Sequence, residues 1–432
     1  MPSMHQLHYR EVFRALAFLA VATGCSRPPQ APPAPPSERP IAVAIRERLH
    51  SKVLNEDRVV DVYVPPSYAE SNAHYPVLYL LDGEAHLEHT EGLTRFLAGT
   101  SRAPELIVMS VQNVDRPDEH CCRDRDFTPA PDPKFRFDGR PATEMFPTAG
   151  GADRFLRFLT EELIPHVEAR YRTAAFRVLF GHSLSGLFAL YAFRERPDVF
   201  RGVIVASPAV WWNDGELAAT LPKFASTLAP LERALYFTCA NEPEDMRGPL
   251  RRLEAALGAI PNNRLRSRFT QLLDENHLST PHLTLYNGLR FVFDGWPLPE
   301  TLLPSPDTIK VLNVEELLSH YSRLSTRYGF DVLPPEELLN GVGYLLLDAK
   351  RTDAALLLFT RNVAFYPQSA NAQDSLADAL AQTGHFSEAV AKAQRAVALA
   401  AESKDPRLQL FERRVSEFRA RAAAAGTKQS TP

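Results

Sequence analysis

The chain has 432 residues, of which 45% are hydrophobic, and its formal net charge is -4. This length predicts two or three domains, and the apolar content suffices for a large core. The charge balance excludes the strongly basic surface of a nucleic-acid-binding protein. Four cysteines without a CxxC pair exclude a disulfide scaffold and give no indication of a zinc site.

The N-terminus has the pattern of an export signal over residues 1–25. Its apolar run, residues 15–24, is too short to span a bilayer and ends in small residues directly before Cys25. That ending resembles the lipobox of bacterial lipoproteins, in which the cysteine is acylated; a simple secretion signal, or neither, is the alternative. The proline-rich residues 26–40 are expected to form an extended tether. We therefore expect an exported protein, periplasmic or held at a membrane only by a lipid anchor.

Residues 41–300 alternate short apolar runs with amphipathic segments, as expected for an α/β domain with a mostly parallel central sheet covered on both faces. Helices are expected at residues 153–171 and 184–194. The long aperiodic segment 113–151 is interpreted as a lid or pocket wall. The expected strands are residues 58–64, 77–81, 106–111, 176–180, 202–206, 234–238 and 268–273.

The strongest chemical signal is the sequence Gly-His-Ser-Leu-Ser-Gly at residues 181–186, between an apolar run and a helical pattern. A nucleophile elbow needs such a sharp strand-to-helix turn, with small residues on both sides of the serine. Ser183 is the predicted nucleophile, and the N–H of Leu184 would face the developing oxyanion. Ser185 stands where a second glycine is usual; it is small enough for the turn to survive.

A serine hydroxyl needs a neighbouring base, and in this fold the chain order is serine, acid, histidine. His277 follows the strand expected to end at residue 273 and is the predicted base; the competitor, His282, lies where a helix should begin. The predicted acid is Glu242, the carboxylate nearest to the end of the strand at 234–238. Asp245 is the alternative, although it could equally cap the next helix. His182, inside the elbow, is expected to point away from the nucleophile.

The remaining candidates line the expected site. The second oxyanion donor would be the N–H of Gly83 or Glu84, after the strand at residues 77–81, unless this loop is a simple tight turn. Two kinds of side chain are candidates for the substrate pocket. They are aromatic residues, which could equally belong to the core, and arginines of the expected lid, which could equally be solvated. These are Trp211, Trp212, Arg116 and Arg125.

The cysteines leave their pairing open. Cys121 and Cys122 are neighbours, so a disulfide between them would be strained, and one of them could instead pair with Cys239.

Several separated blocks resemble the putative esterase family, which contains esterase D and the enterochelin esterases. They are GHSLSGLFALYAFRERPDVFRGVIVASPAVWW at 181–212, YPVLYLLDGEAHL at 75–87, RDRDFTPAP at 123–131, GGADRFLRFLTEELIPHVEARYRT at 150–173 and ENHLSTPHLTLYNGLRFVFDGW at 275–296. The resemblance implies an α/β-hydrolase fold with Ser183, Glu242 and His277 as a triad. Departures from the family pattern are Ser185, Cys239 before the acid, and extra residues around Cys121.

Beyond an expected linker at residues 301–312 the chain is helical. Residues 338–369 and 372–403 look like two copies of one unit with a period of 34, which resembles tetratricopeptide repeats; a plain helical bundle is the alternative. Helices near 314–328 and 408–422 would cap the stack. The predicted helical domain spans residues 313–425, a disordered tail is expected at 426–432, and the repeats could bind a protein partner.

The sequence therefore predicts an exported carboxylic-ester hydrolase that acts on a small-molecule ester through an acyl-enzyme, without a metal or cofactor. A siderophore-type ester is implied by the resemblance only. Acyl transfer by the same fold is one alternative, and a non-catalytic scaffold that uses the helical repeats is another.

Overall fold

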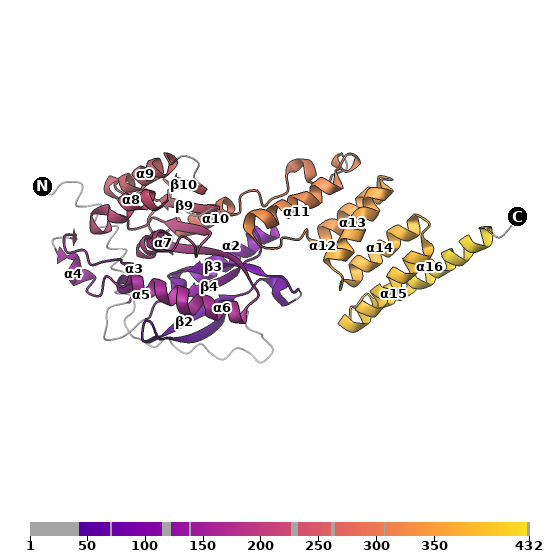
Figure 1. The fold of residues 1–432 in the computed structure, drawn as a ribbon, viewed down its shortest axis with the longest axis horizontal. Coiled ribbons are helices and arrows are strands. Elements are labelled where there is room, and N and C mark those ends of the chain that lie inside the picture. The colour runs from indigo at the N-terminus through magenta and orange to yellow at the C-terminus, as the bar shows by residue number, and fades with distance from the viewer. Residues whose placement is uncertain are drawn as a thin grey trace. The chain divides into compact units, whose positions relative to one another are not determined.

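A computed structural model describes residues 43–69, 71–114, 122–137, 140–225, 232–260, 264–305 and 307–429. The chain divides into two compact units, residues 1–297 and 298–432, whose elements run from indigo to red and from orange to yellow in Figure 1. The expected signal segment with Cys25, the proline-rich tether, Arg116 and Cys121 lie outside the described residues.

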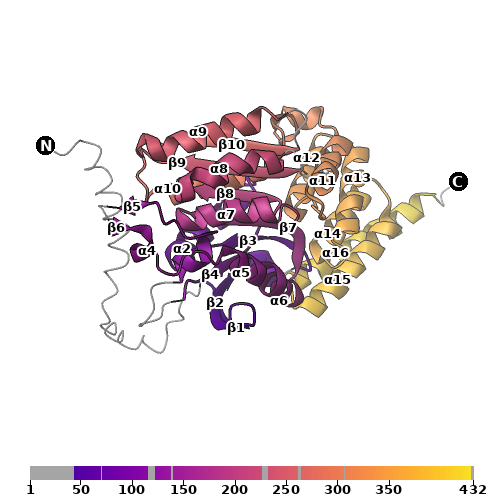
Figure 2. The same ribbon diagram turned by 60° about the vertical axis from the view of Figure 1, so that its left-hand side comes forward.

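The first unit is built on a sheet of eight strands: β1 (Ile45–Ser51), β2 (Glu56–Tyr63), β3 (Tyr75–Leu80), β4 (Ile107–Val111), β7 (Thr173–His182), β8 (Gly202–Ala206), β9 (Arg233–Cys239) and β10 (Leu265–Gln271). Their order is β1-β2-β4-β3-β7-β8-β9-β10, with β3 and β7 in the middle (Figure 2). The six strands from β4 to β10 in this order run parallel to one another, whereas β2 pairs antiparallel with both β4 and the edge strand β1. The sheet is therefore mostly parallel, as the sequence predicts.

Helices connect these strands: α2 (Gly83–Gly99), α3 (Arg123–Phe127), α4 (Ala142–Met145), α5 (Ala152–Arg157), α6 (Ile164–Arg170), α7 (Leu184–Glu195), α8 (Trp212–Ala225), α9 (Glu244–Gly258) and α10 (Thr280–Val292). Shorter pieces are η1 (Pro66–Ala69), the π-helical turn η2 (Phe158–Leu163) and a ribbon of β5 (Arg136–Phe137) and β6 (Arg140–Pro141).

Side chains alternate between the two faces of the sheet and bury both. On β8, Val203 and Val205 belong to the core that α7 closes, whereas Ile204 faces the opposite side and packs against Gly288 of α10. Because the carboxyl ends of parallel strands meet at one edge, the loops that follow β3, β7, β8, β9 and β10 come together there.

The second unit consists of helices: η3 (Glu300–Leu302), η4 (Thr308–Lys310), α11 (Val314–Tyr328), α12 (Glu336–Asp348), α13 (Thr352–Phe365), α14 (Ala370–Gln382), α15 (Phe386–Ser403) and α16 (Leu408–Gln429). The starts of α12 and α14, at 336 and 370, are 34 residues apart, and so are those of α13 and α15, at 352 and 386. These intervals equal the period seen in the sequence.

Several boundaries differ from the sequence-based expectations. Strand β1 is absent from them because its charged, mostly exposed residues do not form an apolar run. The helix expected at 153–171 contains the π-turn η2, followed by Pro165, which cannot donate a helical hydrogen bond. Two short 3₁₀ turns lie in the expected linker, and α16 continues to Gln429, into the segment expected to be a disordered tail.

Candidate active site

Ser183 lies at a sharp turn between β7 and α7. Its backbone has φ 60° and ψ −116°, a conformation that residues other than glycine rarely adopt because it costs free energy. The serine N–H donates to Ala206 O, and its own carbonyl accepts from the N–H of Ala209, so the next strand and its loop hold the turn. A side chain at Gly181 would overlap the carbonyl of Ser185. The turn has the geometry of a nucleophile elbow.

His277 and Glu242 meet on the loops that follow β10 and β9. The imidazole Nδ1 lies 2.5 Å from Glu242 Oε1, and both side chains are buried. Nδ1 bonded to a carboxylate carries the ring proton, which leaves Nε2 as the basic nitrogen. Among the described residues, His277 Nε2 is buried without a hydrogen-bond partner. Such a nitrogen is available to accept a proton from a hydroxyl.

The other Glu242 oxygen is held by different donors. Oε2 accepts from the thiol of Cys239 at 2.7 Å and from the N–H of Ala240 at 3.2 Å. Burial raises the pKa of Glu242, but the hydrogen bonds from His277 and Cys239 outweigh it, so the net pKa lies below the ordinary value. The carboxylate is therefore ionised at neutral pH.

The two competing candidates lie elsewhere. Asp245 is exposed in the first turn of α9, where its carboxylate accepts from the N–H of Met246. His282 is exposed on α10, with its ring 5.4 Å from that of His89. Glu242 and His277 are the acid and the histidine that the fold brings together.

His182 has a structural role that the sequence did not predict. Its Nε2 donates to the backbone carbonyl of His277 at 2.8 Å, and the two rings are 4.7 Å apart. Burial, together with the nearby His277, lowers the pKa of His182 well below its usual value, so the ring is neutral. The residue next to Ser183 thus fixes the loop that carries His277.

The loop expected to supply the second oxyanion donor opens helix α2. Gly83 is the first residue of α2 and is buried, whereas Glu84 is exposed and its carboxylate accepts from the side chain of Asn113. A side chain at Gly83 would overlap Ser110 Oγ. Leu184 is likewise the first residue of α7. The N–H groups of first helical residues have no acceptor within their helix.

The aromatic pocket candidates follow β8. Trp211 is half-buried and stacks on Phe135 with ring centroids 4.3 Å apart. Trp212 is buried, contacts Phe146 and donates from its indole to Ala130 O. It also borders a cavity of about 320 Å³ beside α7. Trp212 is thus largely a packing residue, and Trp211 is the more accessible of the two.

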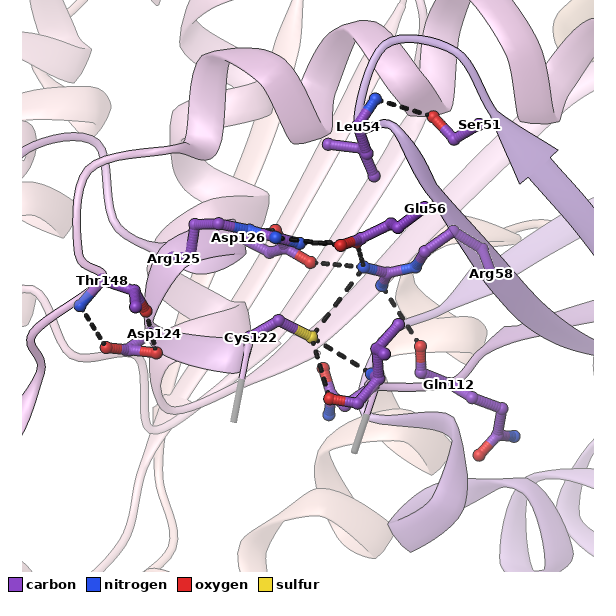
Figure 3. A network of polar contacts seen from close by, with 12 residues as sticks. Ser51, Leu54, Glu56, Arg58, Gln112, Cys122, Asp124, Arg125, Asp126 and Thr148 are labelled. Carbon is purple, nitrogen blue, oxygen red and sulfur yellow. Dashed lines mark hydrogen bonds and ion pairs between the residues drawn. The ribbon is translucent and has the colours of Figure 1, made fainter. Parts of the chain in front are cut away.

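Arg125 is engaged elsewhere in the fold. Its guanidinium donates to both oxygens of Glu56 and to Asp126, which also pair with the fully buried Arg58 (Figure 3). This network fastens α3 to strand β2. The positive charge of Arg125 is therefore paired with carboxylates of the protein itself, and no substrate group is needed to account for it. Cys122 and Cys239 are both free thiols, so the pairing of Cys239 with Cys122 is not formed.

Sequence reasoning missed a second polar group at the elbow, formed by Asp82, Arg123 and the side chain of Ser185. Their contacts are described below. Within the described ranges, no cluster of three or more His, Cys, Asp or Glu side chains could hold a metal ion. No helix of the described part is long and apolar enough to cross a bilayer.

The first unit is similar to known proteins in sequence and in fold. Residues 51–234 match the model of the family described as "Putative esterase". The ferri-bacillibactin esterase BesA of Bacillus subtilis is 29% identical over 55% of this chain and 86% of its own. The siderophore enterobactin esterase of Emericella nidulans is 34% identical over 39% of this chain and 59% of its own. The IroE-like serine hydrolase of Shewanella oneidensis, a solved structure, has 25% identity and a TM-score of 0.63, covering 74% of this chain and 99% of that one.

Fold, elbow and matches together identify the first unit as a serine esterase of the α/β-hydrolase fold. More particularly, the chain is a carboxylic-ester hydrolase similar to the siderophore esterases, joined to a helical second unit.

Proposed function

We propose that this protein is an exported serine hydrolase that cleaves a carboxylic ester through an acyl-enzyme, with Ser183, His277 and Glu242 as its triad. The observation that carries the proposal is the state of His277. Its Nδ1 is bonded to a buried carboxylate, while its Nε2 is buried without a partner among the described residues. The histidine belongs to a loop that His182, the neighbour of Ser183, holds in place.

In the proposed reaction, Ser183 Oγ attacks the ester carbonyl while His277 Nε2 takes its proton. The N–H groups of Leu184 and of Gly83 or Glu84 stabilise the oxyanion. Collapse of the tetrahedral intermediate expels the alcohol, which receives the proton from His277. Water, activated by the same imidazole, then releases the acid and regenerates Ser183. Glu242 keeps the proton on Nδ1 and stabilises the imidazolium.

We further propose a siderophore-type ester as the substrate, because three similar proteins are named as esterases of bacillibactin, enterobactin and triacetylfusarinine C. Trp211 is the candidate for contact with an aromatic or acyl group. The structure gives Arg125 other partners, and Arg116 lies outside the described residues, so an anion-binding role is proposed for neither.

The proposed export rests on the apolar run before Cys25, which would be the lipidated residue of a lipoprotein. The second unit would serve a different purpose. Its 34-residue period supports a tetratricopeptide-like stack that binds a protein partner.

Labelling with a fluorophosphonate probe tests the chemistry directly. The wild type should be labelled, Ser183→Ala should not, and kcat on a cleavable ester should fall by about 10⁶. Glu242→Ala should cost roughly 10⁴, and Asp245→Ala should remain near wild type. An unlabelled wild type would favour the non-catalytic scaffold. A crippled Asp245→Ala beside an active Glu242→Ala would overturn the assignment of the acid.

A panel of siderophore trilactones, simple esters and thioesters would then define the substrate. Adding an alcohol acceptor separates hydrolysis from acyl transfer, because a transferase would form a new ester.

A further inference from the structure

The hydroxyl of Ser185 joins the elbow to the loop that precedes α2. It accepts from the N–H of His182 at 2.7 Å and lies 2.6 Å from Asp82 Oδ2. A hydroxyl has one proton, and a carboxylate is a stronger acceptor than the carbonyl of His182, which lies 2.9 Å away. The proton therefore points to Asp82. A glycine at this position could make neither contact.

Asp82 is the residue before Gly83. It is buried and has a left-handed backbone conformation, with φ 53° and ψ 48°, which a non-glycine residue adopts at a cost. Its carboxylate collects further donors. Arg123 binds both oxygens, at 2.8 and 2.9 Å, and the amide of Asn113 donates at 2.8 Å. Together with Ser185, these contacts hold a strained residue directly beside the proposed oxyanion donor.

Arg123 completes the connection. Besides Asp82, its guanidinium donates to the backbone carbonyl of His182 at 3.2 Å. Burial raises the pKa of Asp82, but Arg123 and Ser185 lower it by more than that. The net pKa therefore lies well below its usual value, and the carboxyl is ionised. An uncompensated carboxylate beside a developing oxyanion would oppose the reaction, and the positive charge of Arg123 removes that penalty.

We propose that Ser185, Asp82 and Arg123 form a positioning clamp that fixes the two oxyanion donors, the N–H groups at the starts of α2 and α7, relative to each other. The donors come from segments about 100 residues apart, and their spacing must match an oxygen to within a few tenths of an ångström. The clamp spans both segments with side-chain contacts and rests on the proposed function of the site.

Helix α3 offers a matched control. Arg123 pairs with both oxygens of Asp82. Two residues later, Arg125 pairs with both oxygens of Glu56 (Figure 3), a carboxylate as deeply buried as that of Asp82. Glu56 belongs to strand β2 and to the network that fastens α3 to the sheet. Glu56→Gln therefore removes the ion pair with Arg125, together with the one to Arg58, outside the clamp.

The test compares hydrolysis of p-nitrophenyl butyrate with inhibition by phenylboronic acid, whose tetrahedral serine adduct places an oxygen in the oxyanion hole. Ser185→Ala, Asp82→Asn and Arg123→Gln should each lower kcat by about 10- to 100-fold with little change in KM. The boronate Ki should rise by the same factor. The double variant Ser185→Ala/Asp82→Asn should lose less than the product of the single losses, because one contact is removed twice.

Glu56→Gln should lower the melting temperature but leave kcat and the boronate Ki near wild type. If the clamp variants lose melting temperature only, or lose kcat without a parallel rise in Ki, the clamp is wrong while the proposed function stands. If the wild type neither hydrolyses the ester nor labels with fluorophosphonate, the proposed function itself fails.

Discussion

At the scale of single residues, Glu242 divides its carboxylate between two roles. One oxygen orients His277, and the other accepts from Cys239, a fully buried thiol. Burial and the neighbouring carboxylate raise the pKa of Cys239 far above its usual value, so it stays protonated and can only donate. Cys239 thus limits the rotation of the acid without being exposed to oxidants.

We expect Cys239→Ala to lower kcat/KM by about threefold to tenfold, since a hydrogen bond to a charged group is lost. The acid limb of the pH profile of kcat/KM should move to higher pH, because the lost donor had lowered the pKa of Glu242. Cys239→Ser is the matched variant: it restores a donor and should keep the wild-type limb. An unchanged limb in the alanine variant would show that the thiol only fills space.

At the scale of elements, two glycines of α12 have opposite roles. A side chain at Gly343 would come within 2.5 to 2.8 Å of the Phe359 ring on α13, whereas one at Gly341 meets nothing within 4 Å. Gly343 is therefore needed for α12 and α13 to approach closely. Gly341 has no such packing role, and it lowers the stability of the helix because glycine loses more conformational entropy on folding than other residues.

Gly343→Ala should destabilise the second unit by about 1–3 kcal/mol through overpacking. Gly341→Ala should stabilise it by about 0.5–1 kcal/mol, the difference in helix propensity. Urea unfolding of the full chain, followed by circular dichroism at 222 nm, measures both. Equal effects of the two substitutions would mean that α12 and α13 do not pack as described.

At the scale of the whole molecule, the two units differ in their spectroscopic signals. All three tryptophans, Trp211, Trp212 and Trp296, lie in the first unit, and the regular structure of the described part of the second unit is helical. Tryptophan fluorescence therefore reports the esterase unit, while the signal at 222 nm also reports the helical unit.

We expect the two probes to give different unfolding midpoints, because separate cores unfold as separate units. A truncation after Pro297 should keep fluorophosphonate labelling and the fluorescence midpoint. Coincident transitions in the full chain, together with a truncated protein that fails to label, would show that the units depend on each other.

Much of this architecture was readable from the sequence because the signals are local. Apolar runs and alternating patterns located seven of the eight strands of the main sheet, a 34-residue period matched the helix spacing of the second unit, and the turn at Ser183 was recognisable from its small neighbours. Strand β1 was not predicted because its polar sequence becomes a strand only by pairing with β2. Local patterns predict elements and the loops that follow them, but not an edge strand of this kind.

The sequence by itself thus determined the order of the elements, the elbow and the loops carrying Glu242 and His277. Only the tertiary structure decided which polar groups meet: Arg125 with Glu56, Arg123 with Asp82, and His182 with the carbonyl of His277. The physical reason is that periodicity and turn chemistry act over a few residues, whereas the partner of a buried polar group comes from whatever distant segment the fold brings beside it.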